Sequence, residues 1–454
     1  MSKTIKIRKG LDISLVGAAE KVIVDAPKST TFAVKPPDFH GVAPKMAVKV
    51  GDSVKAGSVL FNDKNNLDIN FASPVSGKLI DIKRGAKRKI LEVVVEADNA
   101  NEYEIFDTTK AAGDAESVKS FLLEAGLWPF IKMRPLDLIA NPTDTPKAIF
   151  ISGFNSEPLS PDYDFTLHGK DKEFQAGIDA IAKLTLGKVY LGLKNGTGDN
   201  ALIGATGVEK ISVSGPHPAG NVGVQIHHTS PINKGEVVWT VNAQDVALIG
   251  NTVLTGKFDA TRLVALTGSN AKNRKYYRTT IGAQVSTIVT GNTETDNSRI
   301  VSGGPLTGVK IEANNFLNYY SSQVTVLEEG NRHKFFVTEG WLSPGLTTKL
   351  FSASRAYPSW MMPKSKKYTL DTNLNGEERA FVVTEQYEKV FPFDIFPVQL
   401  VKAAITNDID NMEKLGIYEV APEDFALCEF ICTSKIESQK HIREALDLIK
   451  EECM

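Results

Sequence analysis

The pattern of apolar residues changes character near residue 100, and this change constrains the fold more than any single motif. Before it, short apolar runs are separated by turns that contain glycine, such as Gly51-Asp52 and Ala56-Gly57. Residues 48–50, 78–82 and 90–96 are rich in aliphatic side chains and are predicted to be strands. Several short strands at close spacing predict a small barrel or sandwich.

After residue 100 the chain alternates between helix-like and strand-like segments. Residues 115–127 and 174–186 carry apolar side chains at helical spacing, which predicts two amphipathic helices. Strands are predicted at residues 147–152, 188–193 and 210–213. Alternating strands and helices are typical of an α/β layer with a mostly parallel sheet.

Beyond residue 256 the pattern changes twice more. Residues 262–311 return to short strands and turns, which predicts a small α+β domain. The C-terminal part of the chain is predicted to be more helical. Pro397 and Pro422 each suit the first turn of a helix and indicate where two helices begin. Residues 442–449 carry apolar side chains along one face of a C-terminal helix.

Composition and charge exclude several classes of protein. Hydrophobic residues make up 42% and charged residues 23% of the 454 residues, as in a globular chain rather than a disordered or fibrous one. The net charge of −2 lacks the broad positive field of non-specific nucleic-acid binding, so we expect no nucleic-acid partner. Three cysteines exclude a disulfide scaffold and favour a reducing compartment. We find no apolar run long enough for a bilayer and no signal peptide at the N-terminus.

Two ordered motifs resemble the biotinyl/lipoyl carrier fold. Residues 50–60, VGDSVKAGSVL, are followed by residues 73–77, SPVSG, and Lys64 lies between them, where carriers bear the modified lysine on an exposed hairpin. Lys64 is therefore a candidate attachment site for a swinging arm. Its distance to Pro74 is longer than in true carriers, and Asn65 stands where carriers have an apolar residue. We favour a carrier-like fold that has kept its shape without the arm.

Two glycine-containing stretches point weakly to nucleotide or flavin binding. Residues 196–201, GTGDNA, match the G-x-G-x-x-A turn that presents backbone N–H groups to a pyrophosphate. The residues after it include Gly204 and Gly207 and make a poor helix, and no acidic residue stands ~20 positions on to hold a ribose. Residues 204–206 faintly resemble the tripeptide at which some bacterial flavoproteins attach FMN. A flexible loop is the favoured interpretation.

The remaining candidates are thiols and histidines. Cys428 and Cys432 are too few for a zinc or iron–sulfur centre, which usually takes four ligands, so two buried free thiols are favoured. Residues 215–220, GPHPAG, and the pair His227-His228 gather three of the seven histidines. A metal or proton-relay site is one interpretation, and a turn that shapes a docking surface is the favoured one. No catalytic residue and no metal site is predicted.

Six segments in order along the chain resemble one protein family. They are residues 5–12 (IKIRKGLD), 48–64 (VKVGDSVKAGSVLFNDK), 125–135 (AGLWPFIKMRP), 215–228 (GPHPAGNVGVQIHH), 385–400 (EQYEKVFPFDIFPVQL) and 423–435 (EDFALCEFICTSK). Together they resemble the NqrA family, whose members belong to the sodium-translocating NADH:quinone oxidoreductase of bacteria. That family is also similar to the C subunit of the Rnf complex and, more distantly, to the NADH-oxidising flavin subunit of respiratory complex I.

The resemblance implies a multidomain α/β plus β fold with four parts. We expect a biotinyl/lipoyl-like barrel-sandwich domain at residues 1–100 and a Rossmann-like α/β domain at residues 101–256. A small ubiquitin-like (SLBB) α+β domain follows at residues 257–330, and a mainly helical domain at residues 331–454.

The resemblance also implies a role and a set of partners. The complex passes electrons from NADH to quinone and exports Na⁺, using FAD, FMN and Fe–S groups. This chain is expected at the cytoplasmic face of the bacterial inner membrane, bound to the membrane and flavin subunits.

In the complex I relative, a glycine-rich stretch cradles FMN and a cysteine-rich bundle holds an Fe–S cluster. Here residues 125–130 hold one glycine, and Trp128 and Phe130 would block a phosphate. We therefore expect no redox cofactor on this chain and no catalysis by the isolated chain.

The family has been linked to the quinone-reducing end of the reaction. The candidate quinone or docking loop consists of Gly215, His217, Pro218, Gly220, His227 and His228. Two alternatives stay open. One is a soluble carrier-like or flavin-dependent enzyme that uses Lys64 or the residue 196–201 loop, and the other is an interaction scaffold that never meets quinone.

Overall fold

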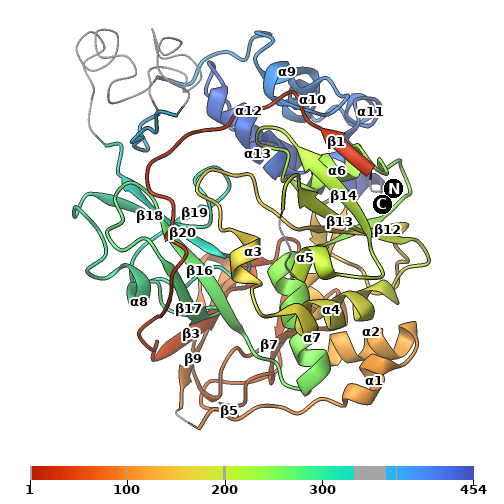
Figure 1. Ribbon diagram of the computed structural model, residues 1–454, viewed down its shortest axis with the longest axis vertical. Helices are drawn as coiled ribbons and strands as arrows, with labels where there is room; N and C mark the ends of the chain where they lie inside the picture. Colours follow the sequence, from red (N-terminus) through yellow and green to blue (C-terminus); the bar gives the residue numbers. More distant parts are fainter. Residues whose placement is uncertain (1–2, 99, 198–200, 332–364, 375, 454) are drawn as a thin grey trace.

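The structure is a computed structural model that describes residues 3–98, 100–197, 201–331, 365–374 and 376–453. Four β-sheets, the helices that accompany them and a group of C-terminal helices make up this part of the chain. Figure 1 shows the C-terminal helices at one end of the molecule and the small N-terminal sheets at the other, with the α/β sheet between them.

Two small antiparallel sheets form the predicted barrel-sandwich. Their strand orders are β3-β9-β8-β5 and β4-β6-β7. The strands are β3 (Thr31–Val34), β4 (Pro44–Met46), β5 (Ser53–Val54), β6 (Val59–Asp63), β7 (Asn66–Ala72), β8 (Gly77–Arg84) and β9 (Ile90–Ala97). The fully buried rings of Phe61 and Phe71 stack in their core with centroids 4.5 Å apart.

The prediction of a strand at residues 48–50 is wrong. The backbone N–H of Lys49 donates to the Asp52 carboxylate at 2.8 Å, so this segment is a turn. Short polar side chains that bond to nearby backbone compete with strand pairing in this way.

A seven-stranded sheet forms the centre of the fold, in the order β1-β14-β13-β12-β15-β10-β11. The strands are β1 (Lys3–Lys6), β10 (Lys132–Arg134), β11 (Leu138–Ile139), β12 (Ala148–Ser152), β13 (Lys188–Lys194), β14 (Glu209–Ser214) and β15 (Val238–Asn242). Pairing is parallel from β1 to β15 and antiparallel at β10 and β11. The first four residues of β12 are buried, as in a parallel sheet covered on both faces.

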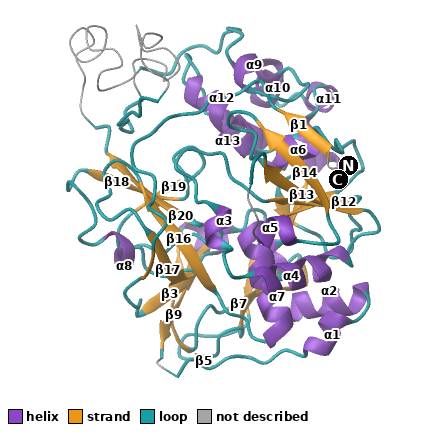
Figure 2. Cartoon of the chain, viewed as in Figure 1, coloured by secondary structure: helices purple, strands orange, loops and turns teal. Residues whose placement is uncertain are grey.

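Seven helices accompany this sheet in the described residues. They are α1 (Thr108–Ala112), α2 (Ala115–Glu124), α3 (Tyr163–Thr166), α4 (Asp171–Ala182), α5 (Ala201–Gly204), α6 (Val222–His227) and α7 (Ala243–Thr255). Figure 2 shows α4 and α7 packed side by side. They approach closely because Gly250 has no side chain, and a Cβ there would collide with the carbonyl oxygen of Glu173.

A third sheet holds the strands of the predicted ubiquitin-like domain, in the order β19-β18-β20-β16-β17-β2. Its elements are β2 (Ile23–Asp25), β16 (Thr261–Thr267), β17 (Tyr276–Thr280), α8 (Ser286–Val289), β18 (Ser298–Ser302), β19 (Val309–Ile311) and β20 (Gln323–Glu328).

The N-terminal segment, residues 3–25, adds one strand to the seven-stranded sheet and one to the third sheet before the chain enters the barrel-sandwich. β1 pairs with β14 and β2 pairs with β17 before the chain reaches β3. Residues 3–6 and 23–25 therefore pair outside the barrel-sandwich, although the predicted range of that domain, 1–100, includes them. The four domain limits themselves stay a prediction.

The C-terminal part is helical, as predicted. Its helices are α9 (Tyr387–Val390), α10 (Pro397–Ile405), α11 (Ile409–Lys414), α12 (Ala426–Ile431) and α13 (Ser438–Cys453). Pro397 begins α10 as expected, whereas Pro422 begins a 3₁₀ turn (Pro422–Phe425) that leads into α12. The apolar face of α13 is fully buried.

Candidate functional site

A cavity of about 230 Å³ lies at the carboxyl ends of β12 and β15. The chain passes from β12 outward through β13 to β14 and then returns to β15 on the other side of β12. Ligands of open α/β sheets bind at such a switch point, where the strand order reverses. Ser152 and Asn242, the last residues of the two strands, both line the cavity.

Other parts of the chain complete the walls of the cavity. Lys132 and Arg134 come from β10, and Phe130 from the 3₁₀ turn Trp128–Phe130 just before it. Tyr320 comes from the loop before β20, and Glu423 from the turn before α12. The α/β sheet, the third sheet and the C-terminal helices therefore meet at this cavity.

His217 is the buried histidine of the cavity, with 3% of its surface exposed. Burial lowers its pKa to about 4, so the ring is neutral near pH 7. Nδ1 lies 3.0 Å from the Ser156 hydroxyl. Nε2 is buried and has no hydrogen-bond partner among the described residues. One ring nitrogen thus remains available for a further hydrogen bond.

The loop that carries His217 is anchored through its backbone. The N–H of His217 donates to the Asp12 carboxylate at 2.9 Å, and its carbonyl accepts from the N–H of Leu11 at 2.8 Å. Gly10, at φ +147°, lies so close to that carbonyl that a Cβ would collide with it. Asp12 and His217 are 205 residues apart in sequence, and their two segments hold each other in place.

A buried charge cluster borders the cavity. Arg134 donates to Glu423 at 2.6 Å and to Asp424 at 3.3 Å. Burial opposes the charge of Arg134, but the carboxylates of Asp137, Glu423 and Asp424 raise its pKa above the usual value. Burial raises the pKa of Asp424 to about 7, and Arg134 opposes part of that rise. The cluster joins β10 to the C-terminal helices and can hold a proton near neutral pH.

Glu157 connects the cavity to the third sheet. Its buried carboxylate accepts the backbone N–H groups of Leu306 at 2.8 Å and Thr307 at 3.1 Å. Burial raises the pKa of Glu157, and these N–H donors oppose part of the rise. Gln439 of α13 donates to the carbonyl of Leu306 at 3.3 Å. The turn at residues 306–307 is thus held from two sides.

Lys132 and aromatic rings give the cavity a cationic donor and flat walls. The Lys132 ammonium lies 4.6 Å from the ring centroid of Tyr320, a cation–π distance. Its charge lowers the pKa of Asp137 and opposes part of the rise at Asp245, two carboxyl groups that also line the cavity. Phe130 meets Tyr320 edge-on with centroids 6.4 Å apart, and the Tyr320 hydroxyl donates to the carbonyl of Pro129 at 2.6 Å.

The structure separates the six candidate loop residues into two groups. His217 and Gly220 line the cavity, and Gly215 and Pro218 belong to the same loop. Gly215, at φ +134°, allows a close approach to Ile7.

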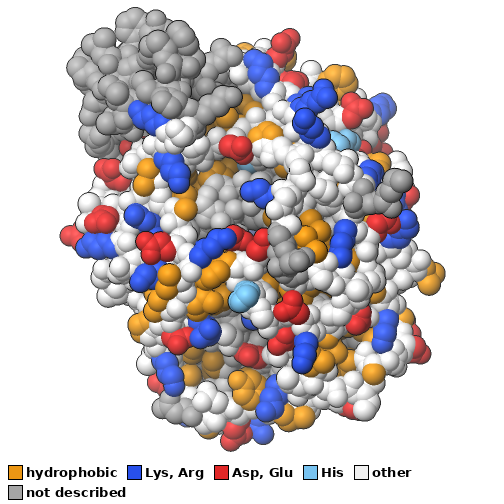
Figure 3. Space-filling view, viewed as in Figure 1, with side chains coloured by type: hydrophobic (Ala, Val, Ile, Leu, Met, Phe, Trp, Pro, Cys, Tyr) orange, Lys and Arg blue, Asp and Glu red, His pale blue; other side chains and the backbone are white. Residues whose placement is uncertain are grey.

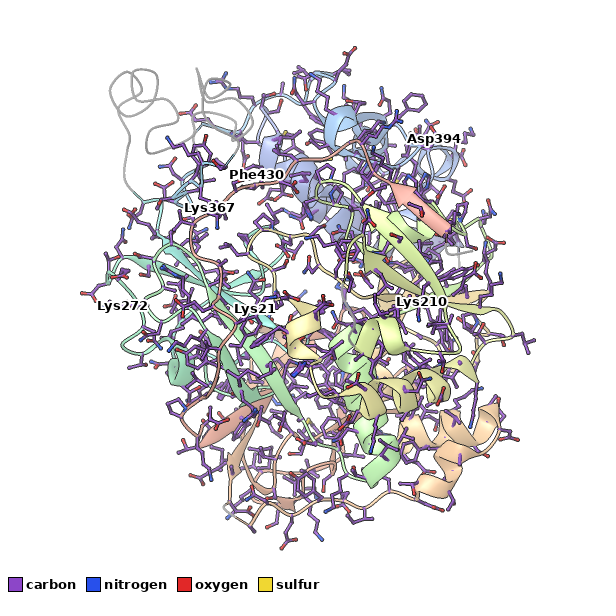
Figure 4. The ribbon with its side chains drawn as sticks, viewed as in Figure 1. Lys21, Lys210, Lys272, Lys367, Asp394 and Phe430 are labelled. Atoms are coloured by element: carbon purple, nitrogen blue, oxygen red, sulfur yellow. The ribbon has the colours of Figure 1, made fainter. Side chains whose placement is uncertain are left out.

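His227 and His228, at the end of α6, do not line the cavity. The two nitrogens of His227 bond Glu419 at 2.6 Å and the N–H of Asp394 at 3.1 Å. These bonds tie α6 to the C-terminal helices, where Figure 4 marks Asp394. Nδ1 of His228 lies 2.9 Å from the carbonyl of Val224.

The other candidates lie away from the cavity. Lys64 is exposed in the two-residue turn between β6 and β7, the place predicted for a carrier lysine. Gly196 follows β13, and residues 198–200 of its motif lie outside the described residues. Cys428 and Cys432 are buried free thiols. No cluster of three or more metal-binding side chains occurs in the described ranges.

Sequence reasoning missed several residues of the cavity. Glu157 of the cavity wall and Ser156, which bonds His217, follow the predicted strand at residues 147–152, and the switch-point rule marks the residues after such a strand. Lys132 and Arg134 lie inside a motif noted in the sequence, but no local signal showed that Arg134 bonds Glu423. Tyr320 carried no signal at all.

Two general features complete the description. In the described part of the chain, no helix combines the length and the apolar character that a membrane crossing requires. Positive and negative side chains are mixed over the face shown in Figure 3, in line with the small net charge.

The fold and the cavity define a modular protein: a Rossmann-like sheet joined to a barrel-sandwich, a small mixed domain and a helical end. Family models match three of these parts. They are the NqrA N-terminal barrel-sandwich hybrid domain at residues 5–98, the NqrA second alpha/beta domain at 113–258 and the NQRA C-terminal domain at 263–313.

Among the relatives that match over the full length are two from different genera. The A subunit of the Na(+)-translocating NADH-quinone reductase from Vibrio vulnificus (strain YJ016) is 36% identical over 99% of this chain and 100% of that protein. The protein of the same name from Neisseria meningitidis serogroup A has the same identity and coverage. This chain belongs to their family, the NqrA family, which confirms the predicted resemblance.

One solved structure is similar to about half of the chain. The NAD+-reducing [NiFe]-hydrogenase in the H2-reduced state matches 49% of this chain and 46% of its own, with 14% identity and a TM-score of 0.33. A similarity this low supports no inference about function.

Proposed function

We propose that this chain is the peripheral NqrA component of a Na⁺-translocating NADH-quinone reductase. The complex couples electron transfer from NADH to quinone to the export of Na⁺. The full-length similarity to relatives of that name supports the proposal. The partners are the membrane and flavin subunits, and the place of assembly is the cytoplasmic face of the bacterial inner membrane.

Within this role, the cavity receives the head group of the quinone. The observation that carries this step is the neutral His217 with an unpartnered Nε2, in a cavity that Lys132 also lines. Quinone carbonyl oxygens accept hydrogen bonds, and a flat ring suits the walls formed by Phe130 and Tyr320. A cavity of about 230 Å³ has room for the ring, so the isoprenoid tail lies outside it.

Four of the six family-like segments support the same site. Residues 5–12 anchor the loop that carries His217, and residues 215–228 contain that loop. Residues 125–135 supply Lys132 and Arg134, and residues 423–435 supply Glu423. Segments spread over the whole sequence thus meet around one cavity.

The redox groups (FAD, FMN and Fe–S) and the NADH site belong to the other subunits in this proposal. Trp128 is fully buried in the segment that resembles the flavin stretch, and its ring nitrogen donates to the carbonyl of Ala140 at 2.7 Å. Gly126 packs against Ala72. Core packing of this segment supports the absence of a flavin cradle. The purified chain should be colourless, and a stoichiometric flavin or Fe–S spectrum would contradict this.

Photolabelling tests the quinone site. A photoreactive quinone analogue is applied to the isolated chain and to the assembled complex, and the labelled peptides are mapped. We expect label on residues 125–135 and 215–228, displaced by an unlabelled short-chain quinone. Lys132→Met and His217→Asn should each weaken labelling about tenfold, the loss of one good hydrogen bond.

His168→Asn is the matched control, because His168 is exposed and does not line the cavity. Label on other segments only, or label that Lys132→Met and His217→Asn leave unchanged, would refute the quinone site. It would then favour a scaffold that never meets quinone.

The carrier alternative has one observation in its favour, the exposed Lys64 at the tip of its hairpin. Intact-mass spectrometry of the native chain decides this point. A lipoyl or biotinyl adduct would support the alternative, and an unmodified mass would exclude it.

A further inference from the structure

We infer that Ser156 is a positioning residue that keeps the His217 ring in the tautomer with its proton on Nε2. In this tautomer His217 offers a hydrogen-bond donor to a carbonyl oxygen in the cavity. The choice of ligand rests on the proposed quinone site, whereas the tautomer is argued from the hydrogen bonds of Ser156.

The hydrogen bonds of the Ser156 hydroxyl determine the tautomer. The backbone N–H of Gly220 donates to Oγ of Ser156 at 2.8 Å. The hydroxyl carries a single hydrogen, and the only acceptor found for it in the described residues is Nδ1 of His217, at 3.0 Å. If the hydroxyl donates there, Nδ1 must be the bare nitrogen, because a neutral imidazole has one donor and one acceptor nitrogen. The ring proton then resides on Nε2.

The surroundings hold the ring in this state. His217 is almost fully buried, so the neutral form is favoured. Its backbone is fixed on both sides by Asp12 and Leu11, which holds the loop in place, and the ring bonds Ser156. Ser156 is fixed as well, because it bonds Gly220 of the same loop.

The open hydrogen bond on Nε2 points to a ligand with an acceptor. A buried N–H group without a partner is unfavourable, and a bound acceptor removes that cost. Lys132 lines the same cavity and adds a charged donor, and Arg134 lies in the same wall. A carbonyl compound can therefore meet one neutral and one charged donor, whereas a ligand that offers only donors would leave both unpaired.

Nitrogen NMR reads the tautomer directly. The full chain is labelled with ¹⁵N-histidine, and the His217 signals are assigned by their loss in His217→Asn. In the wild type we expect a protonated Nε2 and a bare Nδ1. Ser156→Ala should remove this preference, and Ser156→Thr should retain it.

Ser160→Ala is the matched control, because Ser160 lies in the same loop as Ser156 but donates to the carbonyl of Asn155 and not to His217. It should leave the His217 tautomer unchanged. A wild-type ring with its proton on Nδ1, or a Ser156→Ala variant with an unchanged tautomer, would overturn the positioning role.

A binding measurement separates this inference from the proposed function. The probe is 2,3-dimethoxy-5-methyl-1,4-benzoquinone, which has the ring and no tail. We expect its affinity to fall about tenfold in Ser156→Ala and to recover in Ser156→Thr. If the wild type has the expected tautomer and binds no probe, the quinone site fails while the geometry of Ser156 and His217 stands. If the probe binds equally to wild type and Ser156→Ala, the positioning role fails while the quinone site stands.

Discussion

Replacing Asp424 by asparagine should change how the stability of the chain depends on pH. Asp424 is completely buried between β10 and the C-terminal helices. Its Oδ2 accepts the N–H of Ala421 at 2.9 Å and faces Arg134, while Oδ1 has no partner among the described residues. Asparagine has nearly the same shape and keeps an acceptor oxygen, but it cannot ionise. The variant therefore isolates the effect of the charge.

The magnitude follows from the pKa of Asp424, which burial raises from 3.8 to about 7. This difference corresponds to about 4 kcal/mol, at ~1.4 kcal/mol for each pH unit. The folded state binds the proton of Asp424 more tightly than the unfolded state does, so protonation stabilises the fold. This stabilisation is complete below about pH 4 and is lost as the pH rises through 7. The wild type should thus lose about 4 kcal/mol relative to Asp424→Asn between about pH 4 and pH 8.

Urea unfolding of both proteins across this range measures the difference in the free energy of unfolding. Hydrogen exchange at residues 421–431 shows whether the change is local to the junction. Asp81→Asn, at an exposed position of β8, is the control and should run parallel to the wild type. Groups that titrate equally in both proteins cancel in the difference. Parallel curves for Asp424→Asn and wild type would refute the reasoning.

Three further changes probe the packing around the cavity. Arg134→Met leaves buried carboxylates without their cation and should cost about 3–5 kcal/mol in urea unfolding at pH 8, less at pH 6, where Asp424 holds its proton. Gly250→Ala forces α4 and α7 apart and should lower stability by about 1–3 kcal/mol, seen as a lower Tm; an unchanged Tm would contradict the close crossing. Glu157→Ala leaves two backbone N–H groups unpaired and should cost about 1–3 kcal/mol and speed hydrogen exchange at residues 303–311. Glu157→Gln should retain most of the protection, and equal exchange in both variants would contradict the role of the carboxylate.

Local pattern placed most of the elements that it predicted but missed others, such as β15 and α7, and it failed at the ends of helices. The helix predicted at residues 174–186 begins at Asp171 and stops at Ala182, because Thr185 bonds the carbonyl of Pro146 at 2.7 Å and the chain turns there. The helix predicted at residues 115–127 stops at Glu124, two residues before Gly126 at φ +66°. Helical periodicity continues past both ends, so periodicity alone could not locate them.

The local sequence pattern could not predict which strands pair when they lie far apart in the chain. β1 looks like a strand near a carrier domain, yet its partner is β14, more than 200 residues later. A parallel pair leaves no turn signal, because its connection can be of any length. The histidine loop was recognised from its residue types, but only the fold separates His217 in the cavity from His227 in a contact between elements.

The composition of the cavity shows why its function cannot reside in the α/β domain alone. The sheet supplies His217 and the switch point, but Asp12 from the N-terminal segment fixes the loop of His217. The aromatic wall needs Tyr320 from the third region, and Arg134 is balanced by Glu423 from the C-terminal helices. An excised α/β domain would hold the buried charge of Arg134 without Glu423 and Asp424, and the loop of His217 without its anchor. The N-terminal segment, the α/β sheet, the third sheet and the C-terminal helices are thus energetically coupled at one place, and a change that loosens one of these junctions should alter the same cavity.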